Sequence, residues 1–255
     1  RAELGAYPGV QVRDIAVASA AADGDGFAVT LADGAAVPAR RLLLATGVTD
    51  ELPPVEGLAG LWGRGVYHCP YCHGWEVREQ PVAVLGGDDD AAWLALNLAR
   101  LGCDVVLCTA GEPAVGEAAR GALAARGVRV CEDRVLGVTG APGRFVRLSL
   151  SPGWTLERRA LFVHPATRQG SDLAGQLGCA LLEDGSVRVN ELGQTSVPGV
   201  YAAGDLCRSE AWPRPLAQVV MAAGLGARAA VVIDQELLFA EAFGDAAVPS
   251  STTGK

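Results

Sequence analysis

The sequence predicts an α/β protein, on three observations: its composition, one strand–helix–strand pattern, and two apolar strands that end near glycine. The 255 residues include 33 glycines and are 50% hydrophobic but only 5% aromatic, which suits closely packed layers of strands and helices. Residues 82–108 follow a βαβ pattern, and the apolar strands at 42–45 and 200–203 are typical of a parallel sheet.

The N-terminal segment predicts a small β-meander, because short apolar runs alternate there with Asp-Gly turns. Pro53, Pro54 and Gly57 then interrupt regular structure, so we place a domain boundary near residue 55. The strands of this segment are expected at residues 15–18, 27–31, 36–38 and 42–45.

The middle segment continues the α/β pattern to a second boundary near residue 181. Its first helix is predicted from the apolar residues Trp93, Leu94, Leu96, Leu98 and Leu101. Other elements are expected at 82–85, 105–108, 115–125 (helix), 128–131, 145–150 and 161–163. After the second boundary come strands at 187–189 and 200–203, a helix over about 217–239, and a disordered tail at 246–255.

Charge and cysteine usage exclude several classes of protein. The 21 Lys and Arg against 29 Asp and Glu give a net charge of −8, so we expect no nucleic-acid partner. The apolar run at 219–227 is far shorter than the ~20 residues of a spanning helix, and no secretory leader is recognisable. Seven cysteines with one close pair do not resemble a secreted disulfide framework, so we expect a cytoplasmic protein.

Cys69-Pro70-Tyr71-Cys72 is the sharpest local motif, because two thiols at this spacing can close a disulfide that is easily reduced and reformed. The flanking His68 and His73 can supply positive charge or take a proton. A zinc knuckle, a haem attachment site and two inert thiols are alternative interpretations. Zinc would need a second ligand pair that the sequence does not offer, and we predict no metal site.

Two further segments combine an apolar strand with a glycine. Thr46-Gly47 follows the strand at 42–45, and Gly204-Asp205 follows the strand at 200–203. Glycine allows a ligand to approach the backbone, and the Asp205 carboxylate can accept hydrogen bonds from a hydroxyl group. An ordinary turn is the alternative for either segment alone.

With the cysteine motif placed between these two segments, the chain resembles the thioredoxin reductase family over residues 1 to about 240. The resemblance implies two Rossmann-like dinucleotide-binding domains of three layers (ββα). A discontinuous FAD domain would comprise residues 1–54 and 182–245, and a pyridine-nucleotide-like domain carrying the cysteines would comprise 55–181. It implies a homodimer and FAD contacts by Thr46, Gly47, Gly204, Asp205 and Gln218.

Two departures concern the nucleotide sites. The family opens with a βαβ unit bearing G-x-G-x-x-G for FAD, and this sequence starts beyond it, so we expect an N-terminally truncated FAD domain. The second nucleotide loop, 86–91, has Asp88 in place of a phosphate-binding glycine, and the strand at 105–108 is not followed by the family's arginines. Helix capping explains Asp88 equally well. Because the arginines are absent as well, NADP(H) is doubtful as the physiological reductant.

The third departure is His73, where thioredoxin reductases have Asp. Cys-x-x-Cys-His resembles the dithiol oxidases of this superfamily, such as those that close the disulfide of gliotoxin or holomycin. We therefore predict an FAD-dependent enzyme that oxidises a small-molecule dithiol with oxygen. Cys69 and Cys72 would be the redox pair, with Cys72 nearer the flavin by resemblance, and His73 the base. The alternatives are an NAD(P)H-dependent reductase acting on a thioredoxin-like protein, and a non-catalytic or metal-binding module.

Overall fold

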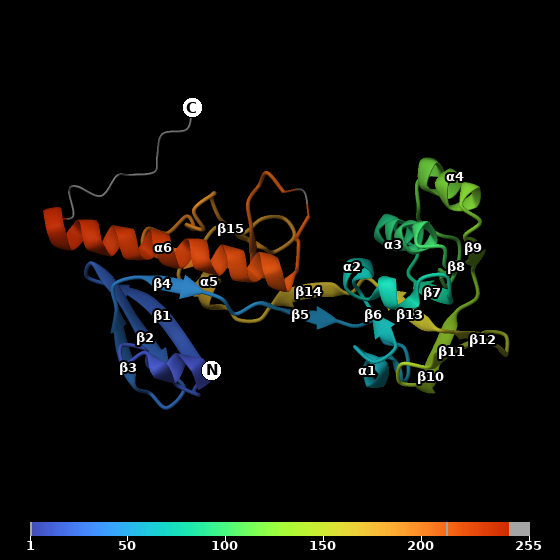
Figure 1. Ribbon diagram of the computed structural model, residues 1–255, viewed down its shortest axis with the longest axis horizontal. Helices are drawn as coiled ribbons and strands as arrows, with labels where there is room; N and C mark the ends of the chain where they lie inside the picture. The colour runs from blue at the N-terminus through green and yellow to red at the C-terminus, as the bar shows by residue number, and fades with distance from the viewer. Residues whose placement is uncertain (1, 213, 245–255) are drawn as a thin grey trace. The chain divides into compact units, whose positions relative to one another are not determined.

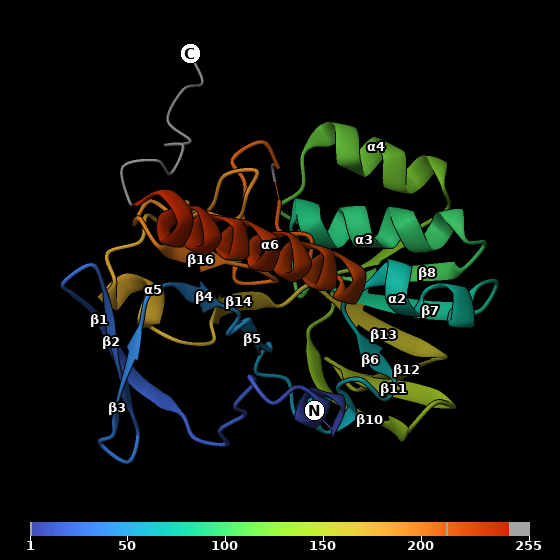
Figure 2. The ribbon, with the colours of Figure 1, turned by 60° about the vertical axis from the view of Figure 1, so that its left-hand side comes forward.

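The chain folds into two compact units. The computed structural model describes residues 2–212 and 214–244, so the predicted tail at 246–255 lies outside the described residues. Unit 1 combines Arg1–Thr49 with Arg168–Lys255, and unit 2 is Asp50–Thr167 (Figures 1 and 2). The segments joining the units, β5 (Val48–Glu51) and β14 (Ala166–Gln169), pair in a two-stranded sheet.

Unit 2 is built on a five-stranded parallel sheet with the order β6-β13-β7-β8-β9. The strands are β6 (Val66–Tyr67), β7 (Pro81–Leu85), β8 (Asp104–Cys108), β9 (Arg129–Cys131) and β13 (Ala160–Val163). Helix α3 (Asp89–Arg100) connects β7 to β8, and α4 (Glu117–Ala125) connects β8 to β9. This mixed α/β arrangement with a parallel sheet confirms the predicted fold class.

Different layers cover the two faces of this sheet. Alternate strand residues such as Val82 and Leu107 pack with α3 and α4, while their neighbours such as Ala83 and Val106 pack with an antiparallel meander. The meander comprises β10 (Val135–Ala141), β11 (Phe145–Leu150) and β12 (Trp154–Arg158). Burial on both faces explains why these strands are nearly continuous apolar runs in the sequence.

The described residues of unit 1 form three small sheets in addition to the β5–β14 pair. The antiparallel sheet comprises β1 (Val17–Asp23), β2 (Gly26–Leu31) and β3 (Ala36–Ala39); the parallel pairs are β4 (Leu42–Leu44) with β16 (Val200–Ala202), and β15 (Val187–Arg188) with β17 (Cys207–Arg208). The first strand, predicted at 15–18, instead spans Val17–Asp23, because the hairpin pairs its alanines with β2 up to the turn.

The boundary of the middle domain also differs from the expected residue 181. Helix α5 (Leu173–Gln176) packs in the core of unit 1 with Ala20 and Phe27, and the Ala20 N–H donates to the Gln176 side chain at 3.3 Å. Residues 168–181 therefore belong with unit 1.

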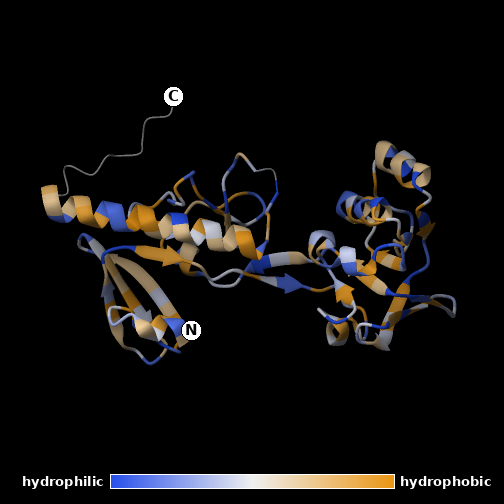
Figure 3. Ribbon diagram, viewed as in Figure 1, coloured by the Kyte–Doolittle hydropathy of each residue, from blue (hydrophilic) through white to orange (hydrophobic). Residues whose placement is uncertain are grey.

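The remaining helices are short except for α6. They are η1 (Ala2–Ala6), α1 (Leu58–Leu61), α2 (Pro70–His73), η2 (Trp75–Val77) and α6 (Val219–Phe243). Helix α6 carries apolar residues around its circumference, seen as repeated orange bands in Figure 3, and Ala229 is its buried residue. Even so, no helix in the described part of the chain has the length and hydropathy to cross a bilayer.

Candidate active site: a disulfide in unit 2 and a glycine-rich strand end in unit 1

The cysteine pair of unit 2 forms a disulfide at the start of a short helix. Cys69 and Cys72 are bonded, with their Cα atoms 5.2 Å apart. Strand β6 ends at Tyr67, and Pro70 opens α2, so Cys69 occupies the N-cap position. The Cys72 N–H donates to the Cys69 sulfur at 3.0 Å, which stabilises negative charge on that sulfur when the pair is reduced.

The two sulfur-bearing residues differ in exposure. Cys69 is buried, whereas Cys72 is exposed. His73 is half-buried and stacks on Tyr67, with ring centroids 4.2 Å apart. The Nδ1 atom of His73 is buried and has no hydrogen-bond partner among the described residues. No described neighbour therefore fixes the tautomer of the ring through that nitrogen.

Aromatic side chains surround the exposed side of this pair. Tyr71, between the cysteines, lies near Trp93 of α3, with ring centroids 6.2 Å apart. Trp75 is exposed and stacks against Arg78, whose guanidinium carbon is 4.1 Å from the ring centroid. Exposed aromatic rings next to a reactive disulfide provide an apolar surface for a small substrate.

The loop at 86–91 is organised by helix capping. Asp88 is the N-cap of α3, and its carboxylate accepts the N–H of Ala91 at 2.9 Å. Gly86 has φ +146°, and a Cβ there would lie 2.7 Å from the Ala91 Cβ, so this position requires glycine. A negative charge thus occupies the N-terminus of α3, where the phosphate of a nucleotide would otherwise accept hydrogen bonds from backbone N–H groups.

In unit 1 the predicted flavin residues meet at one end of the β4–β16 pair. Because these strands are parallel and in register, Thr46-Gly47 and Gly204-Asp205 follow at the same edge, where the Ala203 N–H donates to the Leu44 carbonyl at 3.0 Å. Gln218 is the N-cap of α6. A Cβ at Gly204 would lie 3.6 Å from the Ala222 Cβ in the first turns of α6, so the strand end and the helix start adjoin.

These residues fit a flavin dinucleotide. Gly47 and Gly204 both have positive φ, +64° and +85°, and leave the backbone open to close approach. The first turn of α6 presents N–H groups to an anion, and Asp205 offers a carboxylate for hydroxyl groups. Leu43, expected to be buried on this strand, is exposed, whereas Leu44 on the opposite face packs in the core of unit 1.

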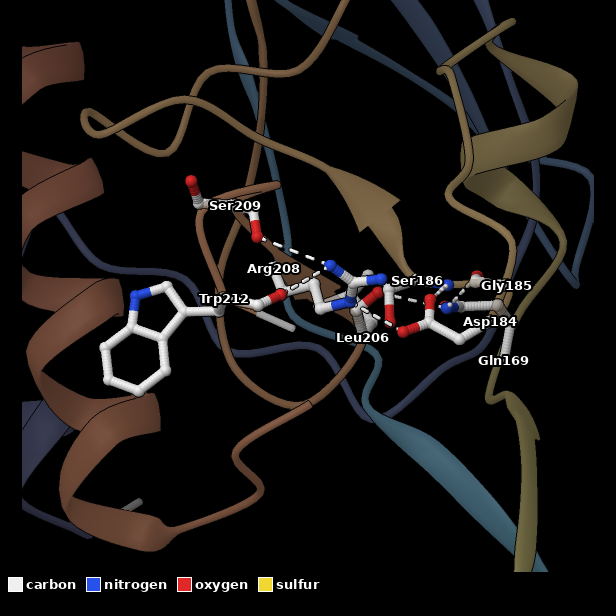
Figure 4. A network of polar contacts seen from close by, with 8 residues as sticks. All are labelled: Gln169, Asp184, Gly185, Ser186, Leu206, Arg208, Ser209 and Trp212. Carbon is white, nitrogen blue, oxygen red and sulfur yellow. Dashed lines mark hydrogen bonds and ion pairs between the residues drawn. The ribbon is translucent and has the colours of Figure 1, made fainter. Parts of the chain in front are cut away.

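A polar network holds the segment after Gly204-Asp205 (Figure 4). Arg208 pairs with the Asp184 carboxylate at 2.6 Å and donates to the Trp212 carbonyl at 2.7 Å. Burial acts to raise the pKa of Asp184, but hydrogen bonds from the Ser186 backbone and from Arg208 outweigh it and lower this pKa below its ordinary value. Gln169 donates to the carbonyls of Gly185 and Leu206 at 2.8 and 3.0 Å.

One pair of neighbouring thiols carries no signal in the sequence. Cys103, Cys108, Cys131, Cys179 and Cys207 are free, and two of these, Cys108 and Cys131, face each other on β8 and β9. No group of three potential metal-ligating His, Cys, Asp or Glu side chains occurs among residues 2–212 and 214–244.

Comparison with known proteins identifies relatives. A sequence family described as pyridine nucleotide-disulphide oxidoreductase matches residues 9–226. A thioredoxin reductase of Gibberella zeae is 32% identical over 214 residues, covering 70% of this chain and 62% of the relative. Thioredoxin reductase sirT of Leptosphaeria maculans is 33% identical over 246 residues, covering 89% of this chain and 72% of the relative. The chain thus spans less than two thirds of the first relative's length.

Solved structures share the fold over most of the chain. The oxidoreductase from Agrobacterium tumefaciens has a TM-score of 0.83 and 33% identity, covering 94% of this chain and 78% of that one. The crystal structure of HlmI has a TM-score of 0.82 and 36% identity, covering 94% and 74%.

Proposed function

The chain belongs to the pyridine nucleotide-disulphide oxidoreductase family, and on that premise we propose that it is an FAD-dependent enzyme that oxidises a small-molecule dithiol to a disulfide, with oxygen as the electron acceptor. The observation that carries this proposal is the Cys69–Cys72 disulfide, exposed at Cys72 and followed directly by His73.

The proposed reaction is two successive thiol–disulfide exchanges. A substrate thiolate attacks the Cys69–Cys72 disulfide, which forms a mixed disulfide and releases one cysteine as a thiolate. The second substrate thiolate then attacks the substrate sulfur of the mixed disulfide, which releases the cyclic or linear disulfide product. The enzyme has then gained two electrons and holds both cysteines reduced. The Cys72 N–H stabilises the charge on the Cys69 sulfur during these steps.

His73 is proposed to move the protons of these exchanges. The attacking species is a thiolate, so a base near the disulfide speeds the reaction by taking the substrate proton. His73 follows Cys72 in the chain, is half-buried, and stacks on Tyr67, which orients its ring. Its Nδ1 atom has no hydrogen-bond partner among the described residues, so no neighbour occupies that nitrogen.

Residues Thr46, Gly47, Gly204, Asp205 and Gln218 are the proposed FAD-binding set of unit 1. FAD held by these residues would supply a two-electron acceptor for the dithiol, with oxygen as the final oxidant and hydrogen peroxide as its product. The Arg208–Asp184 pair and the Gln169 hydrogen bonds would keep the Gly204-Asp205 turn in the conformation that FAD requires.

The loop at 86–91 supports electron flow from a dithiol to the flavin. In a reductase, NADPH phosphates would bind at the start of α3, but there the Asp88 carboxylate already accepts the Ala91 N–H. This charge disfavours a nucleotide, which supports a dithiol as the electron donor. The names of the relatives favour a second candidate, an NAD(P)H-dependent reductase of a thioredoxin-like protein, in which the same disulfide would work in the opposite direction.

Anaerobic reduction of the flavin-loaded protein distinguishes these two functions. We expect dithiothreitol, a small dithiol, to bleach the flavin absorbance, and NADPH or NADH to leave it unchanged. In air, dithiothreitol oxidation should consume oxygen and form hydrogen peroxide in equal amounts. Rapid bleaching by either nucleotide at micromolar concentration would contradict the oxidase and support the reductase.

Matched cysteine variants test the assignment of the redox pair. Cys69→Ser and Cys72→Ser should each abolish bleaching by the dithiol, because neither can form the disulfide. Cys103→Ala, which removes a buried free thiol that donates to the Val77 carbonyl, serves as the control and should retain bleaching. Equal loss in all three variants would indicate damage to the fold instead of loss of the redox pair.

A further inference from the structure

A second pair of thiols lies side by side on neighbouring strands of unit 2. Cys108 ends β8, Cys131 ends β9, and the two residues are directly paired in the parallel register. Both belong to the face of the sheet that packs on the meander. Paired residues on adjacent strands are about 4.8 Å apart. Disulfide-bonded cysteines have Cα separations of about 4.4–6.8 Å, so the register allows a bond between these two residues.

The two thiols differ in exposure and chemical state. Cys108 is fully buried, and this burial, together with the neighbouring Cys131 thiol, raises the pKa of Cys108 to about 12. Cys131 is half-buried on the edge strand of the sheet. An oxidant from solvent therefore reaches Cys131 first. Cys108 lies beside it as a protonated thiol.

A surface cavity of about 400 Å³ opens onto Cys131. Arg158 and Arg129 line it, as do the carboxylates of Glu132 and Asp133. Arg129 is paired with Asp104 at 2.9 Å, whereas the Nε atom of Arg158 is buried with no hydrogen-bond partner among the described residues. The charge of Arg158 also acts on Cys108. Arg158 thus places a positive charge near Cys108 and in the lining of the cavity that holds Cys131, and the two arginines there balance the two carboxylates.

We propose that Cys131 and Cys108 form a second redox pair, in which a hydroperoxide entering this cavity oxidises Cys131 and Cys108 closes the disulfide. The Cys131 thiolate attacks one peroxide oxygen, which gives a sulfenic acid and hydroxide. The Cys108 thiol then condenses with the sulfenic acid, which forms the Cys108–Cys131 bond and releases water. The positive charge of Arg158 favours the thiolate that attacks the peroxide. The proposal rests on the proposed function only for the source of peroxide.

The test uses the flavin-loaded protein with Cys69→Ser and Cys72→Ser, which removes the first redox pair and any peroxide that it would generate. The protein is treated with hydrogen peroxide, denatured, alkylated and mapped by mass spectrometry. We expect the loss of two alkylatable thiols, with a crosslinked peptide pair containing Cys108 and Cys131. The buried single thiols Cys103 and Cys179 should stay reduced and should therefore be alkylated after denaturation. Because peroxide is added, failure here is independent of failure of the proposed oxidase activity.

Two further variants test the order of events. In Cys131→Ser, which changes the half-buried residue at the sheet edge, Cys108 should be oxidised at least about tenfold more slowly. Arg158→Gln should slow disulfide formation about tenfold, which corresponds to about 1.4 kcal/mol of lost charge stabilisation. Retention of both thiols in the parent protein, equal oxidation of Cys103, or unchanged oxidation of Cys108 in Cys131→Ser would overturn the proposal.

Discussion

Replacement of Asp88 by asparagine is expected to strengthen NADPH binding at the start of α3. The Asp88 carboxylate lies 2.9 Å from the Ala91 amide nitrogen, so a phosphate bound at this helix start would approach it closely. A carboxylate about 5 Å from a phosphate charge costs about 3 kcal/mol at an effective dielectric of about 20 and about 1 kcal/mol in bulk water. The N-terminus of α3 stabilises a bound phosphate by only about 0.3–1 kcal/mol.

Asparagine removes the charge but keeps the cap, because its side-chain oxygen can still accept the Ala91 N–H. Asp88 is exposed, so the gain in binding free energy for NADPH lies between the value for bulk water and the value at an effective dielectric of about 20. The dissociation constant for NADPH should therefore fall about 5- to 150-fold in Asp88→Asn.

Calorimetric titration with NADPH at low and high salt measures this effect. Salt should shrink the difference between Asp88→Asn and the parent protein, because the repulsion is between charges that solvent reaches. The control is Asp25→Asn, which makes the same charge change in the exposed turn between β1 and β2 of unit 1. If both variants gain affinity equally, or if Asp88→Asn gains none, the charge on Asp88 is not what disfavours the nucleotide.

Three further predictions concern proton transfer and stability. His73→Gln should slow dithiol oxidation and remove one limb of its pH–rate profile, and an unchanged profile would place the base elsewhere. Asp184→Asn should lower the free energy of unfolding by about 1–2 kcal/mol, since its ion-pair partner Arg208 has only 14% of its side chain exposed. The folded-state pKa of Asp184 is lowered, so the difference should be full above about pH 4 and vanish as pH falls further in urea titrations. Leu98→Ala should cost about 2–5 kcal/mol in the same assay, and the exposed Leu136→Ala much less.

Sequence patterns predicted the elements whose signals are local. The strands at 82–85 and 105–108 are recognisable because both of their faces are buried, and the capping alternative for Asp88 follows from its place before a helix. The limits of the middle domain depend instead on tertiary packing. Helix α5 packs with Ala20 and Phe27, residues far away in the sequence, and the residues of α5 carry no sign of that partner.

The two cysteine pairs also differ in whether a local sequence signal or tertiary packing brings them together. Cys69 and Cys72 are three residues apart, so the first turn of a helix brings their sulfurs together and the motif alone reveals the pair. Cys108 and Cys131 meet only because β8 pairs with β9 in one register. A slip of one residue would turn the Cys131 side chain to the opposite face of the sheet, away from Cys108 and Arg158. This register is fixed by the apolar residues of the strands, which alternate between the two buried faces of the sheet. The second thiol pair therefore depends on the packing of the core, and it cannot be recognised from the sequence around either cysteine.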